Sequence, residues 1–126
     1  MSDSKNVLVT AGTGGIGSEV VKEFKKNGDN VYITSSTLSK IDNEHIFYWD
    51  MDKPETTKEL LCTLKSKNIH IHTLIHCAHK FSDAKPLLAI KESEVLSSLN
   101  SNIGALFTLS KSLAKLMNRK KSGRIL

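Results

Sequence analysis

Residues Val7–Gly17 read VLVTAGTGGIG, a β-branched run that passes directly into a turn rich in glycine. The run predicts a buried strand over Asn6–Thr10, and an amphipathic helix is expected to follow the turn and end near Gly28. Glycine suits a turn that needs positive φ, or a backbone that must approach a ligand with no Cβ in the way. The spacing Gly12-x-Gly14-x-x-Gly17 therefore predicts a cradle for the diphosphate of a dinucleotide at the helix N-terminus. The alternative is a glycine turn that serves the fold alone.

Hydrophobic periodicity in the rest of the chain alternates between strands and helices. Further strands are expected at Val31–Thr34, Ile46–Trp49, Ile69–Cys77 and from Arg124, and further helices around Leu60–Leu64 and from Glu92 to about Lys120. Strands that are separated by helices of this length pair in parallel through right-handed crossovers. The fold class is therefore α/β, with a doubly wound parallel sheet in three layers that forms a single domain over residues 1–126.

The long helix is expected to face a core with one apolar stripe, made of Val95, Leu99, Ile103, Leu106, Leu113 and Met117. The chain stops about three residues into the fifth expected strand, which would leave apolar sheet exposed. We therefore expect the sequence to be the N-terminal part of a longer protein, incomplete after the fifth strand.

Composition and charge argue against several classes of protein. Hydrophobic residues make up 39% and charged residues 25% of the 126 positions, which suits a globular chain. No apolar run approaches the roughly 20 residues of a bilayer span, and the N-terminus lacks a signal-peptide pattern, so we expect a cytoplasmic protein with no membrane partner. The net charge of +5 arises in residues 95–126, which contain no Asp or Glu. Since these cations recur on one helical face, we interpret them as a solvated surface and expect no nucleic-acid partner.

Three histidines on one expected strand, His70, His72 and His76, share one face by the period of two. Imidazole suits zinc or copper, but His72 and His76 would lie roughly 13 Å apart on an extended strand. We therefore predict no metal site. Cys62 and Cys77 lack metal-binding or redox spacing and are interpreted as small buried side chains outside any disulfide.

Five motifs resemble those of the short-chain dehydrogenases/reductases and occur in the same order. Residues 10–17, TAGTGGIG, resemble the family's TGxxxGIG, with Ala11 in place of the first glycine. Residues 49–52, WDMD, resemble xDVxD, and residues 74–79, LIHCAH, lie where the family has LVNNAG. Residues 102–117 and 122–126 resemble the family's NxxGxF signature, which runs on to a Met, and its G-R/K-I-I/V signature. The long helix looks most like that of bacterial 3-oxoacyl-acyl-carrier-protein reductases.

The resemblance implies a Rossmann-like fold and hydride transfer between NADPH and a small-molecule carbonyl or acyl thioester substrate, a 3-oxoacyl compound being one candidate. In the family an Asp after the third strand and the next backbone amide hold the adenine, which here are Asp50 and Met51. Because the family's long helix often packs against its copy, a homo-oligomer, either a dimer or a tetramer, is also implied. The full set of implied cofactor contacts is Gly12, Thr13, Gly14, Gly15, Ile16, Gly17, Ser35, Ser36, Asp50, Met51, Cys77, Ala78 and His79.

The resemblance places Asn102 in the catalytic proton relay, where the family's Asn anchors a water. An Asn that is satisfied by helix backbone is the alternative. The family's catalytic Ser and Tyr-x-x-x-Lys would lie after the fifth strand, and Tyr32 and Tyr48 have no Lys four residues on, so neither substitutes. The chain as given is therefore expected to bind a nucleotide without reducing a substrate. A non-catalytic nucleotide-binding or partner subunit is the second hypothesis.

The end of the second expected strand bears on the choice between NADP and NAD. An NAD site places Asp or Glu here, and this carboxylate binds the ribose hydroxyls and repels a 2′-phosphate. The chain has the neutral donors Ser35 and Ser36 at this point, with Lys40 nearby. We therefore expect NADP, with NAD as the alternative.

Overall fold

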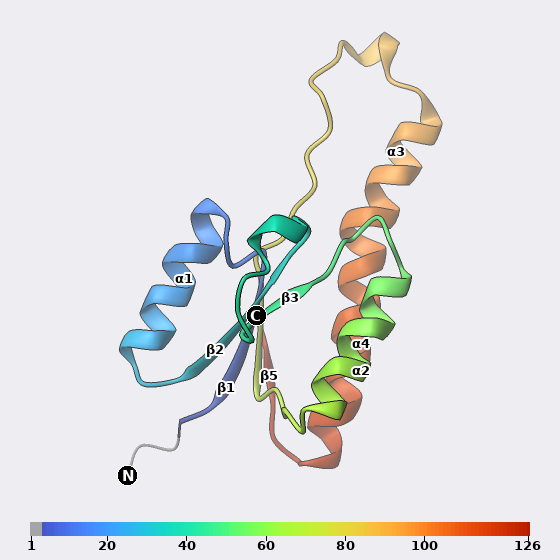
Figure 1. The fold of residues 1–126 in the computed structure, drawn as a ribbon. Helices are drawn as coiled ribbons and strands as arrows, with labels where there is room; N and C mark the ends of the chain where they lie inside the picture. Colours follow the sequence, from blue (N-terminus) through green and yellow to red (C-terminus); the bar gives the residue numbers. More distant parts are fainter. Residues whose placement is uncertain (1–3) are drawn as a thin grey trace.

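The computed structural model describes residues 4–126, which are organised by a 5-stranded parallel sheet in the order β3-β2-β1-β4-β5. Its strands are β1 (Asn6–Thr10), β2 (Asn30–Ser35), β3 (Ile46–Tyr48), β4 (Thr73–His76) and β5 (Arg124–Ile125). The helices are α1 (Gly15–Lys26), α2 (Glu55–Ser66), α3 (Glu92–Leu99) and α4 (Ala105–Arg119), with 3₁₀ turns at Leu38–Lys40 and Leu87–Ala89 and a π turn at Asn100–Gly104. Figure 1 shows α1 on one face of the sheet and α2 and α4 on the other, which confirms the expected doubly wound, three-layer fold.

Alternation along β1 distributes its side chains between two cores. Leu8 belongs to the larger buried cluster, under α2 and α4, while Val7 and Val9 belong to the smaller cluster under α1. Full burial of one aliphatic side chain contributes about 1.5–3 kcal/mol, so β1 is held between the helical layers from both sides. The larger cluster consists of Leu8, Phe47, Trp49, Leu60, Leu64, Ile71, Leu74, Leu109, Leu113 and Met117.

The order of the strands creates a switch point at the centre of the sheet. β1 pairs with β2 along one edge and with β4 along the other, so the chain leaves β1 toward one side and returns on the opposite side. In open parallel sheets, ligands bind in the crevice outside the carboxyl ends of the strands at such a point. The glycine turn after β1 and the segment after β4 flank this crevice.

β4 covers Thr73–His76 and is shorter than the expected strand Ile69–Cys77. The pairing of β4 with β1 begins at Thr73, opposite Val7, and one further backbone hydrogen bond precedes it, from the N–H of His72 to the carbonyl oxygen of Asn6 at 2.9 Å. Before His72, Asn6 donates a hydrogen bond from its side-chain Nδ2 to the carbonyl oxygen of His70 at 2.8 Å. A side-chain contact therefore replaces strand pairing in the segment before His72.

The expected long helix runs through α3, the π turn and α4, and the core-facing part of its apolar stripe lies in α4. This part is buried or half-buried and consists of Leu106, Leu109, Leu113 and Met117. Leu109 was not among the expected stripe residues, although its spacing of three residues from Leu106 and four from Leu113 places it on the same helical face. No helix within residues 4–126 has the length and apolar character that crossing a membrane requires.

The first half of the same stripe is exposed, so the expectation that it faces a core is wrong. Val95, Leu99 and Ile103 are 48%, 48% and 60% exposed. α3 extends beyond the carboxyl edge of the sheet, as Figure 1 shows. The π turn also adds a residue to one helical turn, which rotates the stripe of α3 relative to that of α4.

The hydroxyl group of Thr10, at the end of β1, connects β1 to the segment after β4. Thr10 Oγ1 accepts hydrogen bonds from the backbone N–H groups of Cys77 at 2.9 Å and Ala78 at 3.1 Å. A threonine hydroxyl has two acceptor lone pairs and one proton to donate, so Thr10 donates to His76 Nδ1, 3.0 Å away. His76 is therefore neutral, with its proton on Nε2.

Burial lowers the pKa of His76 below its usual value, and the charge of His79 lowers it further. Protonation of His76 at Nδ1 would also compete with the two N–H groups that already occupy the oxygen of Thr10. The unfolded chain therefore binds a proton at a pH where the folded chain does not. Such a group stabilises the fold fully above its unfolded pKa, and this stabilisation is lost as the pH falls below that value.

We expect the melting temperature to fall between about pH 7.5 and about pH 5.5, since an unperturbed histidine titrates near 6.5. In His76→Asn the side chain cannot be protonated, so the melting temperature should vary less with pH. Differential scanning calorimetry over this range measures both curves. His70, whose pKa is also lowered by burial, remains in both proteins, so the difference between the curves reports His76. Parallel curves would contradict the assignment.

Ala11 begins the glycine turn with a φ of 53°, in the left-handed region that favours glycine. Its N–H donates to Thr34 Oγ1 at 3.1 Å, and its carbonyl oxygen accepts from the N–H of Gly14 at 3.0 Å. The left-handed conformation costs an L-residue roughly 1–2 kcal/mol. Because Ala11 replaces the first glycine of the TGxxxGIG pattern, the backbone of this turn is strained at Ala11.

We expect Ala11→Gly to raise the free energy of unfolding by about 0.5–1 kcal/mol, because relief of strain exceeds the added entropy of the unfolded chain. Urea denaturation monitored by circular dichroism measures this change. Ala105→Gly, in the first turn of α4, is the matched control and should lower the free energy of unfolding by a similar amount. If both variants were destabilised, the backbone at Ala11 would not be strained.

Candidate nucleotide-binding site

A cavity of about 230 Å³ lies at the switch point and is bordered by the segments that follow β1, β2, β3 and β4. It brings together five of the sequence-predicted cofactor residues, namely Ser36, Asp50, Met51, Ala78 and His79. The remaining lining residues are Ala11, Thr34, Trp49, Lys80 and Phe81. The predicted contacts that follow β2, β3 and β4 therefore meet at one crevice, whereas the predicted contacts at residues 12–17 do not line it.

The glycines of the turn serve two different purposes. A Cβ at Gly12 would lie 2.3 Å from Ile33 Cγ2, and a Cβ at Gly17 would lie 2.2 Å from the carbonyl oxygen of Ala11. These two glycines permit the close packing of α1 against β1 and β2. Gly15, by contrast, has open space where a Cβ would stand, and Gly14 has only the Ala11 oxygen at 3.3 Å. The latter two are exposed and are available to a ligand.

The N-terminus of α1 opens toward solvent at this turn. Gly14 is the N-cap residue and makes no side-chain cap, and the first turn of the helix carries no acidic residue. The first N–H groups of a helix have no partner inside it, and the helix dipole makes this end positive. Thr13 is half-buried in the turn and Ile16 is exposed beside it. The arrangement can bind an anion such as a diphosphate.

The two serines that end β2 differ in their surroundings. Ser35 is buried, and its Oγ accepts a hydrogen bond from the N–H of Thr37 at 3.1 Å, which closes a turn. Ser36 is exposed and lines the cavity. Of the predicted pair, Ser36 is thus the one whose hydroxyl is free to contact a ligand.

Asp50 lies where β3 enters the loop before α2, and its side chain is 15% exposed. One carboxylate oxygen, Oδ1, accepts a hydrogen bond from the N–H of Asp52 at 2.9 Å and lies 3.7 Å from Lys80 Nζ. The N–H of Asp50 donates to Thr56 Oγ1 at 3.1 Å, which ties the loop to the start of α2. The carboxylate is therefore fixed at the wall of the crevice.

The segment after β4 supplies the opposite wall. Cys77 and Ala78 are held by their bonds to Thr10, and the Cys77 side chain packs on the cluster under α1 instead of lining the cavity. Burial raises the pKa of the Cys77 thiol. His79 is exposed, lines the cavity and lies with its ring 4.5 Å from that of Phe81. Cys77 therefore contributes its backbone position, and His79 its side chain.

Asn102 lies in the π turn and is committed to contacts within the chain. Its Oδ1 accepts from the N–H of Lys80 at 2.7 Å, and its Nδ2 donates to the carbonyl oxygens of Lys80 at 3.0 Å and Ser98 at 3.1 Å. The side chain thus clamps the crevice wall to the long helix. The expected role of Asn102 in a proton relay stays a prediction, and its bond to Ser98 matches the alternative of satisfaction by helix backbone.

Sequence reasoning missed Thr10 and Lys80 as residues of the site. Lys80 follows directly after the LIHCAH segment, and its ammonium group bridges Asp50 and Asp52. The only signal in the sequence was its place beside a motif, because its partners lie 22 residues away in the chain or further. Within residues 4–126, no group of at least 3 His, Cys, Asp or Glu side chains is placed to hold a metal ion.

Comparison with known proteins gives a consistent assignment. The short chain dehydrogenase family model matches residues 5–126. The 3-oxoacyl-acyl-carrier-protein reductase FabG of Buchnera aphidicola is 28% identical over 131 residues, which cover 98% of this chain and 53% of that protein. The chain spans 30% to 53% of the length of the curated relatives that it matches.

Two solved structures share the fold over nearly the whole chain. The short chain dehydrogenase of Leptospira borgpetersenii with bound NAD+ is 26% identical with a TM-score of 0.81, covering 97% of this chain and 50% of that one. ElxO with bound NADP is 28% identical with a TM-score of 0.83, covering 97% of this chain and 54% of that one. Because the family model matches all but the first four residues, the chain belongs to the short chain dehydrogenase family.

Proposed function

We propose that this chain is the nucleotide-binding part of an NADP-dependent oxidoreductase that transfers a hydride between NADPH and a carbonyl compound. The observation that carries the proposal is the uncapped N-terminus of α1, which opens through Gly14 and Gly15 beside the crevice at the switch point. The family membership supports oxidoreductase chemistry. The likeness to FabG makes 3-oxoacyl thioesters the first substrate class to test.

Different residues at the crevice bind different parts of the dinucleotide. The N–H groups at the start of α1 hold the diphosphate, and the Asp50 carboxylate and the Met51 backbone receive the adenine. When bound, the nicotinamide supplies the hydride chemistry. Ala78 and His79 form the wall on the β4 side, and Asn102 holds the next residue, Lys80, against the long helix.

NADP is proposed over NAD on the chemistry at the end of β2. Ser36 is exposed at the crevice, and no carboxylate occupies this strand end to repel a 2′-phosphate. Lys40, exposed in the following 3₁₀ turn, adds positive charge to the same loop. Both cofactors occur among the similar structures, since ElxO was solved with NADP and the Leptospira enzyme with NAD+.

We expect Gly15→Asp to weaken NADPH binding by at least about tenfold, because a carboxylate would face the diphosphate. The same substitution should leave the unliganded fold as stable as before or slightly more stable, since Gly15 has open space and an acid in the first turn favours the helix dipole. Isothermal titration calorimetry and thermal melting measure the two effects.

Gly15→Asn is the matched control, since it has the same size as Gly15→Asp without the charge. The affinity of Gly15→Asn for NADPH should be well above that of Gly15→Asp. Equal affinity of the two variants, or binding by Gly15→Asp at the level of the unmodified protein, would show that the diphosphate lies elsewhere. A protein that binds NADPH but does not oxidise it with any carbonyl or acyl thioester would favour the non-catalytic subunit.

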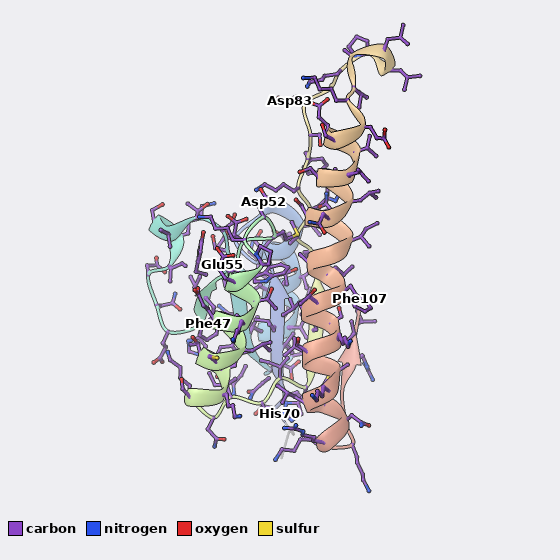
Figure 2. All side chains as sticks on the ribbon, turned by 90° about the vertical axis from the view of Figure 1, so that its right-hand side faces the viewer. Phe47, Asp52, Glu55, His70, Asp83 and Phe107 are labelled. Atoms are coloured by element: carbon purple, nitrogen blue, oxygen red, sulfur yellow. The ribbon has the colours of Figure 1, made fainter. Side chains whose placement is uncertain are left out.

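We also propose that the protein forms a homo-oligomer through the long helix, because one apolar face of this helix is exposed. Val95, Leu99, Ile103 and Phe107 recur every four residues, and each is 48% to 62% exposed. In Figure 2, Phe107 lies on the side of the helix that faces away from α2. A second copy of the same helix would cover this face with matching apolar side chains.

We expect Ile103→Glu to shift the protein toward the monomer, with an association constant at least about tenfold lower, because a buried unpaired carboxylate opposes association. Analytical ultracentrifugation measures the change. The matched control is Leu38→Glu, an equally drastic change at a residue that is 70% exposed on the β2–β3 connection. An unmodified protein that is monomeric at high concentration would overturn the proposal.

A further inference from the structure

Lys80 is the point at which three separate segments of the crevice meet. Its backbone N–H and carbonyl group are both bonded to the Asn102 side chain, so its main chain is fixed against the π turn. Its ammonium group reaches across to Asp50 and Asp52 in the loop after β3. The loop after β4, the loop after β3 and the long helix are therefore joined through one residue.

Asp52 is held from the opposite side by the long helix. Ser101 Oγ donates a hydrogen bond to Asp52 Oδ1, while Lys80 occupies Oδ2. Figure 2 shows Asp52 at the upper end of the sheet, beside the long helix. The bonds to Lys80 and Ser101 lower the pKa of Asp52, and the bond to Asp52 raises the pKa of Lys80, so both groups are charged at neutral pH. Asp52 thus serves as an anchor for the ammonium group, and it does not line the crevice itself.

The contacts of Lys80 with Asp50 and Asp52 leave one oxygen of Asp50 free. Oδ1 is engaged by the Asp52 N–H and by Lys80, whereas Oδ2 has no hydrogen bond or ion pair to any of residues 4–126. An ionised carboxylate only accepts hydrogen bonds, so the free oxygen selects a ligand group that donates. Lys80 also offsets the charge of two neighbouring carboxylates, which would otherwise repel a polyanionic nucleotide.

We propose that Lys80 is a positioning residue that holds the Asp50 carboxylate at the crevice wall with Oδ2 unpaired, so that the preference of the site for a base with an exocyclic amino group depends on Lys80. This inference rests on the proposed nucleotide-binding function. Without the ammonium group, the Asp50 carboxylate keeps only the hydrogen bond from the Asp52 N–H, and the loop that carries both residues loses its tie to the segment after β4. The carboxylate can then turn its free oxygen away from the crevice. The preference for an amino-bearing base is then lost.

The experiment compares the binding of NADPH with that of deamino-NADPH, in which hypoxanthine replaces adenine and the amino group is missing. Isothermal titration calorimetry is performed on the full-length protein and on Lys80→Met, which keeps the apolar stem and removes the charge. We expect the unmodified protein to prefer NADPH by about tenfold or more, as a hydrogen bond to a charged group allows. Lys80→Met should show a preference below about threefold, mainly through weaker binding of NADPH.

Lys85→Met is the matched control, because Lys85 lies in the same loop and forms an ion pair with Glu94 outside the crevice. Its preference for NADPH should equal that of the unmodified protein. Lys80→Arg keeps the charge and should restore most of the preference. Thermal melting confirms that each variant is folded.

The outcomes separate the inference from the proposed function. If Lys80→Met lost the same affinity for NADPH and for deamino-NADPH, the role of Lys80 would be structural alone. If its preference for NADPH were undiminished, Lys80 would not position Asp50. Either result overturns the inference. Equal binding of the two nucleotides by the unmodified protein would overturn it as well, while nucleotide binding itself stands. If the unmodified protein binds neither, the proposed function fails and the inference fails with it.

Discussion

The hydroxyl group of Thr10 determines how the two central loops of this protein sit relative to each other. It is fully buried, accepts from two consecutive backbone N–H groups after β4, and donates to His76. Each of these partners would be costly to bury without a hydrogen bond, at about 1–3 kcal/mol per group. The glycine turn begins one residue after Thr10, so the same bonds fix the width of the crevice between the turn and the segment after β4.

From this point a continuous set of polar contacts leads to the long helix. Cys77 and Ala78, whose N–H groups donate to Thr10, are followed after His79 by Lys80. The backbone of Lys80 is bonded to the Asn102 side chain, and its ammonium group contacts Asp50 and Asp52. The walls of the crevice are therefore joined to each other by hydrogen bonds and ion pairs within the chain. Few of these bonds belong to regular helices or strands, and the site is shaped mainly by loop contacts supported by the sheet.

The general plan of the fold could be predicted from local patterns, because it depends on them. Glycine spacing after a β-branched run placed the first turn, and alternating periods gave the parallel order of strands and helices. The contacts that shape the site join distant residues, such as Thr10 and Cys77, 67 positions apart, and no local period encodes them. The same reason explains why Lys80 was missed. The difference between the buried Ser35 and the exposed Ser36 depends instead on a local turn, which Ser35 Oγ closes by accepting from the N–H of Thr37. The π turn was not predicted, because an apolar stripe indicates that a helix is present but does not show where one helical turn contains an extra residue.

The central position of β1 also has a consequence for the order in which the molecule can fold. The contacts between the β1 and β2 segments join residues 24 apart, whereas those between the β1 and β4 segments join residues 66 apart. Loop closure costs more entropy as the separation grows, and distant pairings slow folding. We expect β1, α1 and β2 to associate early, with the glycine turn already in place, and β4 to dock later. The crevice would then come into existence in one of the last steps, so a nucleotide that binds there stabilises the pairing that is slowest to form.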